Sequence, residues 1–144
     1  MLLDANALFL PVRTGFPLDA EVERECSGAI LAVPASVIGE LDRLVERGAV
    51  GATGARALAD RYPIVRAAGR GDDAVLATAQ RRHAWVVTAD RLLQHRLVRS
   101  GITVLVPRDR HRLQKLLPRG APSARESSRS EGSGARRSLA RGNG

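Results

Sequence analysis

The sequence predicts an α/β fold built on a mostly parallel sheet with helices packed against it. Short apolar runs of strand length alternate along the chain with longer segments whose apolar residues recur every three or four positions, the period of one helical face. Such alternation is typical of parallel sheets, because each crossover between parallel strands requires a helix-length connection. The chain has 144 residues and is 44% hydrophobic, which is enough for one domain with a real core.

The first predicted elements are a strand, a loop, a helix and a second strand. Residues 1–4 are expected to form a buried strand, and residues 11–15 a loop. A helix is predicted over residues 17–27, because the segment opens at a proline and Gly28 follows its end. The apolar run at 29–33 has the length of a strand.

Pro34 opens the next predicted helix. Val37, Leu41 and Leu44 recur at intervals of four and three and therefore share one helical face, and Gly48 ends the segment. An Ala-rich helix and a short strand follow, over residues 52–61 and 63–66.

A strongly periodic helix begins at Asp72, after the glycine turn at 69–71, and runs to about His83. Asp72 lies on its apolar face, three residues before Val75. A strand, a helix and a strand then follow, over residues 84–88, 90–99 and 102–106. Residues 109–117 are predicted to form a short basic helix.

Composition separates a domain from a tail. Residues 1–117 form the predicted domain, whereas 118–144 are rich in Ser, Gly, Arg and Ala and are predicted to be a basic disordered tail. No run of about 18 apolar residues could span a membrane, and the first residues lack the charge and apolar core of a secretion signal. A lone cysteine, Cys26, cannot form an internal disulfide. We therefore expect a cytoplasmic protein.

The net charge of +8 is distributed unevenly. Residues 1–90 carry ten Arg against twelve acids, residues 91–117 carry six Arg and Lys115 against one acid, and residues 118–144 carry six Arg against two acids. A basic second half favours a polyanionic partner such as nucleic acid, because phosphate backbones attract such surfaces without sequence preference. The alternative is a solvated surface from an arginine-biased genome, since the chain has 22 Arg and one Lys.

Four carboxylates lie at the edges of predicted buried surfaces. Asp4 is the only charged side chain among the first twelve residues, and it follows an apolar run just as Asp90 follows the strand at 84–88. Glu40 flanks the apolar face of its helix, and Asp72 begins the helix that runs to about His83. In open parallel sheets ligands bind outside the carboxyl ends of the strands, which is where Asp4 and Asp90 are expected.

Each of these carboxylates also has an ordinary structural explanation. Asp4 could close a turn, and the acids at 72, 73 and 90 could cap helices. Glu40 could pair with a neighbouring arginine at the surface, at little energetic consequence. The occurrence of four acids at the edges of buried surfaces is harder to explain in this way, because a buried charge costs several kcal/mol unless it is paired or bound to a metal.

Clustered carboxylates raise one another's pKa, and a divalent cation relieves this repulsion. Mg²⁺ and Mn²⁺ suit a site of carboxylate oxygens without His or Cys ligands. Such an ion can make a nucleophile of water and neutralise charge on a phosphoryl group. The acidic first half is therefore expected to hold a metal, and the basic second half to hold phosphates.

Four segments resemble, in order and spacing, the motif blocks of PIN-domain nucleases. They are Leu-Leu-Asp-Ala-Asn-Ala-Leu at 2–8, Val-Pro-Ala-Ser-Val-Ile-Gly-Glu-Leu at 33–41, Asp-Asp-Ala-Val-Leu-Ala-Thr-Ala at 72–79 and Val-Val-Thr-Ala-Asp-Arg-Leu-Leu at 86–93. The resemblance covers about residues 1–112 and is greatest to small archaeal PIN proteins related to ribosomal-RNA processing endonucleases. It implies a three-layer fold with a central, mostly parallel sheet flanked by helices.

The resemblance also implies a Mg²⁺- or Mn²⁺-dependent endoribonuclease. Its acidic metal ligands match Asp4, Glu40, Asp72 and Asp90. Asn6 and Thr88 match positions that orient these carboxylates through hydrogen bonds, and Asp73 matches a neighbouring acid found in some members. Arg91 and Arg96 lie nearest to the site in sequence and are expected to hold the RNA backbone.

Two other functions remain open. One is a PIN toxin ribonuclease silenced by a bound antitoxin, and the other is a non-catalytic RNA-binding factor in ribosome assembly. His83, His95 and His111 match no motif; His83 is interpreted as a helix-end residue and the other two as candidate phosphate contacts. The expected partner is RNA, without a membrane, and a homodimer is left open.

Overall fold

The computed structural model describes residues 1–118 of the chain. The strands are β1 (Leu2–Leu3), β2 (Val33–Pro34), β3 (Ile64–Val65), β4 (Val86–Val87), β5 (Val104–Pro107) and β6 (Leu113–Leu116). The helices are α1 (Ala5–Thr14), α2 (Leu18–Glu25), α3 (Ala35–Glu46), α4 (Ala52–Ala59), α5 (Gly71–Arg82) and α6 (Arg91–Arg99). The predicted tail at 118–144 lies, apart from its first residue, outside the described residues.

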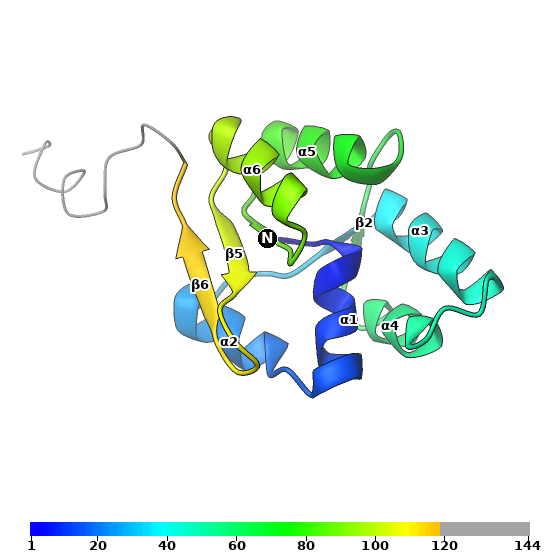
Figure 1. The fold of residues 1–144 in the computed structure, drawn as a ribbon. Coiled ribbons are helices and arrows are strands. Elements are labelled where there is room, and N and C mark those ends of the chain that lie inside the picture. Colours follow the sequence, from blue (N-terminus) through cyan, green and yellow to red (C-terminus); the bar gives the residue numbers. More distant parts are fainter. Residues whose placement is uncertain (119–144) are drawn as a thin grey trace, which may run out of the picture.

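The strands form a mostly parallel sheet, as the alternation of elements predicted. β1, β4 and β5 are parallel neighbours, and β6 pairs with β5 in the antiparallel sense. β2 and β3 form a second parallel pair, which a bridge between Leu2 and Ala32 joins to β1. In Figure 1 the strands lie between α5 and α6 on one side and α1 and α2 on the other. The α/β prediction is therefore confirmed.

The core lies around the two central strands. Leu2, Leu3, Val86 and Val87 are at most 2% exposed, as expected for parallel strands covered by helices on both faces. Burial of each such side chain stabilises the fold by about 1.5–3 kcal/mol. This packing holds the carboxyl ends of β1 and β4 in a rigid position.

The predicted loop at 11–15 is wrong, because most of it belongs to α1. Pro11 lies inside this helix, and Gly15 ends it in the left-handed conformation (φ 69°). A proline removes one helical hydrogen bond, which made a loop the local expectation. The helix forms nevertheless, since it buries Ala7, Leu8 and Phe9 in the core.

The predicted basic helix at 109–117 is also wrong, because its second half is β6. The carboxylate of Asp109 accepts hydrogen bonds from the backbone N–H of His111 (2.8 Å) and Arg112 (3.0 Å), which builds a turn between β5 and β6. Leu113 then enters the core while the next two side chains stay exposed. The remaining predicted helices occur as expected, with ends that differ by a few residues.

Within residues 1–118, none of the helices combines the length and the apolar character that crossing a membrane would require.

Candidate functional site

The carboxyl ends of β1 and β4 bring Asp4 next to Thr88. Leu3 pairs with Val87 in the parallel register, so the chain leaves both strands at the same edge of the sheet. The backbone N–H of Asp4 donates to the carbonyl of Val87 (3.1 Å), which extends the pairing by one residue. Asp4 and Thr88 are therefore the first side chains beyond the ends of two adjacent strands.

The Thr88 hydroxyl connects two of the predicted site residues. It donates to Oδ2 of Asp4 (2.8 Å) and accepts from the backbone N–H of Asp90 (3.0 Å). Asp4 is 4% exposed and Thr88 is fully buried, so this hydrogen bond is shielded from water. The side-chain amide of Gln94 on α6 donates to the carbonyl of Thr88 (3.1 Å), which fixes the loop between β4 and α6.

The side chain of Asp90 caps a helix in this structure. Its Oδ1 accepts from the backbone N–H groups of Leu92 (2.9 Å) and Leu93 (3.2 Å), so it caps α6, as the structural explanation from sequence proposed. These hydrogen bonds fix the carboxylate without using Oδ2. A cap and a ligand role are therefore compatible for this side chain.

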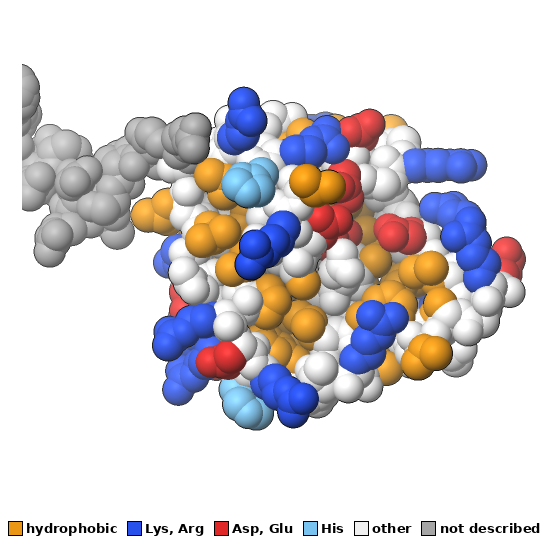
Figure 2. Space-filling model, in the orientation of Figure 1, with side chains coloured by type: hydrophobic (Ala, Val, Ile, Leu, Met, Phe, Trp, Pro, Cys, Tyr) orange, Lys and Arg blue, Asp and Glu red, His pale blue; other side chains and the backbone are white. Residues whose placement is uncertain are grey.

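Helix packing brings the other two carboxylates to the same region. Glu40 lies on α3 and Asp72 in the first turn of α5, and α5 contacts both α3 and α6. Both side chains are partly buried. Figure 2 shows acidic side chains gathered between α6, α5 and α3, with basic side chains around them.

The four carboxylates influence one another electrostatically. Burial is the main cause that raises the pKa of Asp4, and the charges of Asp72 and Asp90 raise it further, against the opposing Thr88 hydrogen bond. Burial also raises the pKa of Glu40, with Asp4 the next cause. For Asp72, burial is the largest cause that raises the pKa and the charge of Asp90 is the second, while the charge of Arg96 lowers it. The site is therefore a cluster of mutually repelling anions.

Glu40 does not form the surface ion pair that was its structural alternative. The ion pairs found within residues 1–118 leave Glu40 without a partner, although the charge of Arg43 modestly favours its ionised form. A half-buried carboxylate without a basic partner adds to the unbalanced negative charge of the cluster.

Asp73 and Arg96 form an ion pair beside the cluster. Arg96 Nη2 lies 2.7 Å from Oδ1 of Asp73, whose side chain is 84% exposed. Asp73 therefore points outward, away from the buried edge that Asp4 occupies. Arg96, which was expected to hold RNA, is engaged by a neighbouring carboxylate, whereas no ion pair within residues 1–118 involves Arg91.

Asn6 is the predicted site residue with the least structural support. It is exposed in the first turn of α1, and no side-chain hydrogen bond within residues 1–118 joins it to Asp4. The orienting contact that Asp4 does make comes from Thr88. A role for Asn6 stays a prediction.

The donor atoms of the cluster fit a hard divalent cation. All four side chains offer carboxylate oxygens, which Mg²⁺ and Mn²⁺ prefer. Burial first, and then the charges of neighbouring acids, raise the pKa values of Asp4, Glu40 and Asp72, and a cation would relieve that repulsion. Among residues 1–118, however, no three His, Cys, Asp or Glu side chains are placed closely enough to form a ready metal site. The fit therefore rests on the chemistry of the donors.

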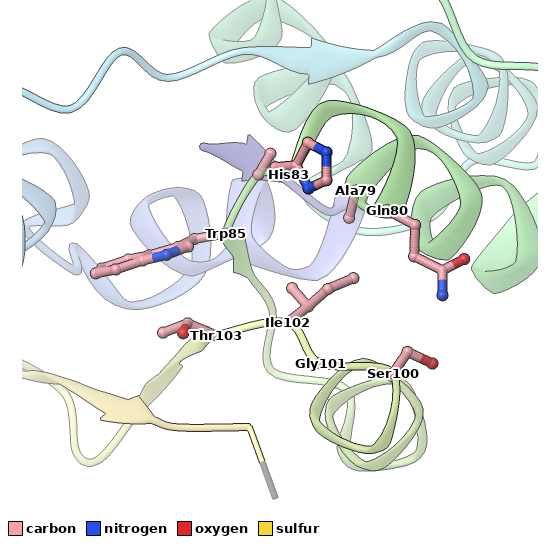
Figure 3. Close-up of a pocket in the computed structure, with 9 residues that line it drawn as sticks. Ala79, Gln80, His83, Trp85, Ser100, Gly101, Ile102 and Thr103 are labelled. Carbon is pink, nitrogen blue, oxygen red and sulfur yellow. The ribbon is translucent and has the colours of Figure 1, made fainter. Parts of the chain in front are cut away.

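Two cavities lie at opposite ends of the strands. One, of about 370 Å³, is lined in part by Ala89, Arg91, Arg108 and Gln114, and it adjoins the loop that bears Thr88. The other, of about 350 Å³, lies before β4 and β5 and is shown in Figure 3. Its lining contains no acidic side chain: Ala79, Gln80, His83, Ala84, Trp85, Ser100, Gly101, Ile102 and Thr103. The lining of the 370 Å³ cavity contains no acidic side chain either, but Asp4 and Asp90 follow the carboxyl ends of β1 and β4, so the carboxylates lie at that end of the strands.

Gln94 and Arg108 also lie at this end of the sheet, and neither was a predicted site residue. Gln94 stands one helical turn after Asp90, so the i, i+4 spacing on α6 could have indicated it. Arg108 had no such signal, because its position depends on the β5–β6 hairpin, where a helix was predicted.

Comparisons with known proteins agree with this architecture. The family whose model matches residues 1–110 is described as a PIN like domain. Among twelve matching chains of solved structures is one described as "Structure of the PIN domain endonuclease Utp24". It superposes with a TM-score of 0.66 and 21% sequence identity, over 81% of this chain and 91% of that chain, which shows a shared fold. No curated protein matches the chain.

Proposed function

Because this chain belongs to the PIN-like domain family, we propose that it is a metal-dependent endoribonuclease that hydrolyses RNA phosphodiester bonds. The observation that supports the proposal most directly is that Asp4, Glu40 and Asp72 lie near enough to other acids, Asp90 among them, for those charges to raise their pKa values. Carboxylates that repel one another while they are partly or fully buried destabilise the fold, and such groups are typical of a functional site.

The carboxylates would hold Mg²⁺ or Mn²⁺. When bound, the ion supplies a water nucleophile at neutral pH and neutralises charge that develops on the phosphoryl group. Asp4 is the central ligand of this proposal, because it is the most deeply buried of the four and its pKa responds to the charges of Asp72 and Asp90.

The chain's own side chains fix the ligands before any substrate arrives. The Thr88 hydroxyl holds Oδ2 of Asp4, and the first turn of α6 holds Oδ1 of Asp90. Both carboxylates are thus attached to rigid elements by hydrogen bonds that limit their rotation. Such preorganisation is what an active site requires, because displacement of a reacting group by about 1 Å can cost about 100-fold in rate.

Arg91 is the better candidate of the two arginines for contact with the RNA backbone. It begins α6, directly after Asp90, and no ion pair within residues 1–118 competes for it. Arg96 would have to exchange Asp73 for a phosphate. The net positive charge of residues 91–117 supports a polyanionic substrate.

We further propose cleavage within an RNA chain, with ribosomal RNA as the first substrate to test. The support is the PIN-like family together with the described endonuclease whose fold this chain shares. A toxin function would place the same chemistry under the control of an antitoxin, and no feature of residues 1–118 favours that arrangement.

The test uses the full chain, end-labelled RNA and Mn²⁺. The parent should release internal fragments, and a chelator should stop this. Asp4→Asn should lower the cleavage rate at least about 100-fold, since a metal ion supplies several kcal/mol of transition-state stabilisation. Asp60→Asn is the matched control, because Asp60 is an exposed aspartate whose partner is Arg56 on the far helix α4.

Equal cleavage by the parent and Asp4→Asn would overturn the proposal. Tight RNA binding by the parent without metal-dependent turnover would support the non-catalytic assembly factor instead.

A further inference from the structure

We propose that the cavity between α6 and the β5–β6 hairpin binds the single RNA strand that flanks the cleaved bond, with Arg91, His95 and Arg108 on its phosphates. We call this cavity the flanking groove. The inference rests on the proposed nuclease function, because it assigns the neighbouring part of the same substrate.

The flanking groove has two walls and adjoins the carboxylates. Its volume is about 370 Å³. One wall is α6, which contributes Arg91, Gln94 and His95, and the other is the hairpin, which contributes Arg108 and Gln114. Ala89 also lines the flanking groove, and it stands in the chain between Thr88 and Asp90. A strand leaving the carboxylate cluster in this direction therefore enters the flanking groove directly.

The walls present donors suited to phosphate. Arg91 and His95 are four residues apart on α6 and so share one helical face, and Arg108 faces the same space from the hairpin. All three are exposed, and no ion pair within residues 1–118 involves them. A guanidinium presents N–H groups in a planar fork that matches phosphate oxygens, so two unpaired arginines across a groove form a phosphate clamp.

Asp109, the acid next to Arg108 in sequence, does not form an ion pair with it. Asp109 turns its Oδ1 into the hairpin turn, where the backbone N–H groups of His111 and Arg112 bind it. Arg96 differs, because it lies on α6 with Arg91 but forms an ion pair with Asp73. The clamp thus consists of the two arginines that line the flanking groove, and neither has a carboxylate partner within residues 1–118.

The flanking groove continues into a second, more apolar cavity of about 250 Å³. The two cavities share Gln94 and His95, and the second adds Val98, Leu116 and Leu117. Figure 2 shows basic and apolar side chains together over α6 and the hairpin, beside the acidic cluster. A charged section followed by an apolar one matches a nucleotide strand, in which phosphates need cations and base faces need apolar contact.

The length of this path fits a short stretch of one strand. Arg91 and Val98 are seven residues apart on α6, which corresponds to a rise of about 10 Å. Phosphates of one stacked strand are about 3.4 Å apart along its axis, so about three nucleotides would follow α6. The substrate class is therefore a single-stranded RNA segment next to the cleavage point.

The test measures binding without catalysis. The full chain is titrated with a short fluorescein-labelled oligouridylate in chelator, over a series of salt concentrations. The double variant Arg91→Gln/Arg108→Gln should weaken binding about tenfold and flatten the slope of log K against log salt by about 1.4, since each single-strand phosphate contact contributes about 0.7. The parent and the variant should have the same melting temperature.

The matched control is the double variant Arg99→Gln/Arg110→Gln. It removes the same charge from the far end of α6 and from the hairpin turn, outside the flanking groove. It should keep the affinity of the parent within about twofold, because charges away from the contact act only through screened attraction. Equal losses in both double variants would show general charge attraction and overturn the inference, as would unchanged binding in the groove variant.

A competition arm distinguishes a strand from free polyphosphate. Unlabelled oligouridylate should displace the probe more effectively than inorganic tripolyphosphate at equal phosphate concentration, and equal displacement would overturn the strand assignment. Failure of the nuclease proposal is detected separately, since Asp4→Asn is assayed by cleavage and the groove variants are assayed by metal-free binding.

Discussion

The hydroxyl of Thr88 donates to Oδ2 of Asp4 over 2.8 Å, and it does so between residues that are 84 positions apart in the chain. The Thr88 hydroxyl oxygen also accepts a hydrogen bond from the backbone N–H of Asp90. One buried threonine thus orients one carboxylate and ties down the loop that bears another.

Replacement of Thr88 by valine should damage the site more than replacement by serine. Thr88→Val leaves Oδ2 of Asp4 without its buried donor, at a cost of about 1–3 kcal/mol in unfolding free energy. Cleavage should fall about 10- to 100-fold, as is typical for loss of a side chain that orients a metal ligand. Thr88→Ser keeps the hydroxyl and should stay near the parent. Chemical unfolding and cleavage rates measure both effects, and identical rates for the two variants would contradict an orienting role.

Manganese should stabilise the protein through the carboxylate cluster. An ion at 100 times its dissociation constant raises the unfolding free energy by about 2.7 kcal/mol, so the melting temperature should rise by several degrees. Asp4→Asn should melt no lower than the parent in chelator, because burial and the neighbouring charges disfavour the ionised Asp4. It should also lose the Mn²⁺-dependent rise, whereas Asp60→Asn should keep it. Thermal scans with and without Mn²⁺ provide the measurement, and a full rise in Asp4→Asn would count against this ligand.

The contact between α2 and β6 should weaken in acid. The Arg24 guanidinium, and then the N–H of Leu113, lower the pKa of Glu21 below its usual 4.5. A lowered pKa in the folded state means that the ionised form contributes stability above about pH 4.5, and that this contribution is lost as pH falls through the folded-state pKa. Urea unfolding at neutral pH and below pH 4.5 should show a smaller pH dependence in Glu21→Gln than in the parent. An identical pH dependence of the unfolding free energy in both proteins would exclude Glu21 as a source of the acid sensitivity.

Removal of the basic tail should reduce general affinity for RNA. Residues 119–144 carry six Arg against two Glu, so a chain that ends at Pro118 loses a net charge of +4. Its salt dependence of RNA binding should be flatter than that of the full chain, because fewer counterions are released. The metal-dependent cleavage rate at saturating RNA should be unchanged, since the carboxylates lie within residues 1–118. An unaltered salt slope would show that the tail makes no phosphate contacts.

Local pattern was sufficient for elements whose own residues decide their conformation. The helices α2 to α6 were predicted from apolar periodicity and from proline or glycine at their ends, and β1, β4 and β5 from short apolar runs. The sequence did not predict α1, because Pro11 is typical of a helix break. The helix forms because burial of Leu8 and Phe9 contributes more stability than the hydrogen bond that the proline removes. β6 was missed because its exposed, basic residues have no strong pattern, and a contact from Glu21 to the N–H of Leu113 helps to hold it against α2.

The sequence by itself determined the α/β class and identified acids at the edges of buried segments as the candidate site, because a charge beside an apolar run is unusual wherever the segment lies. Only the tertiary structure decided the partners of these side chains. Strand register places Thr88 against Asp4, and packing of α5 against α6 places Asp73 against Arg96. The hairpin brings Arg108 opposite Arg91 across the flanking groove. These pairings join residues that are distant in sequence, and they depend on core packing that no local pattern of residues encodes.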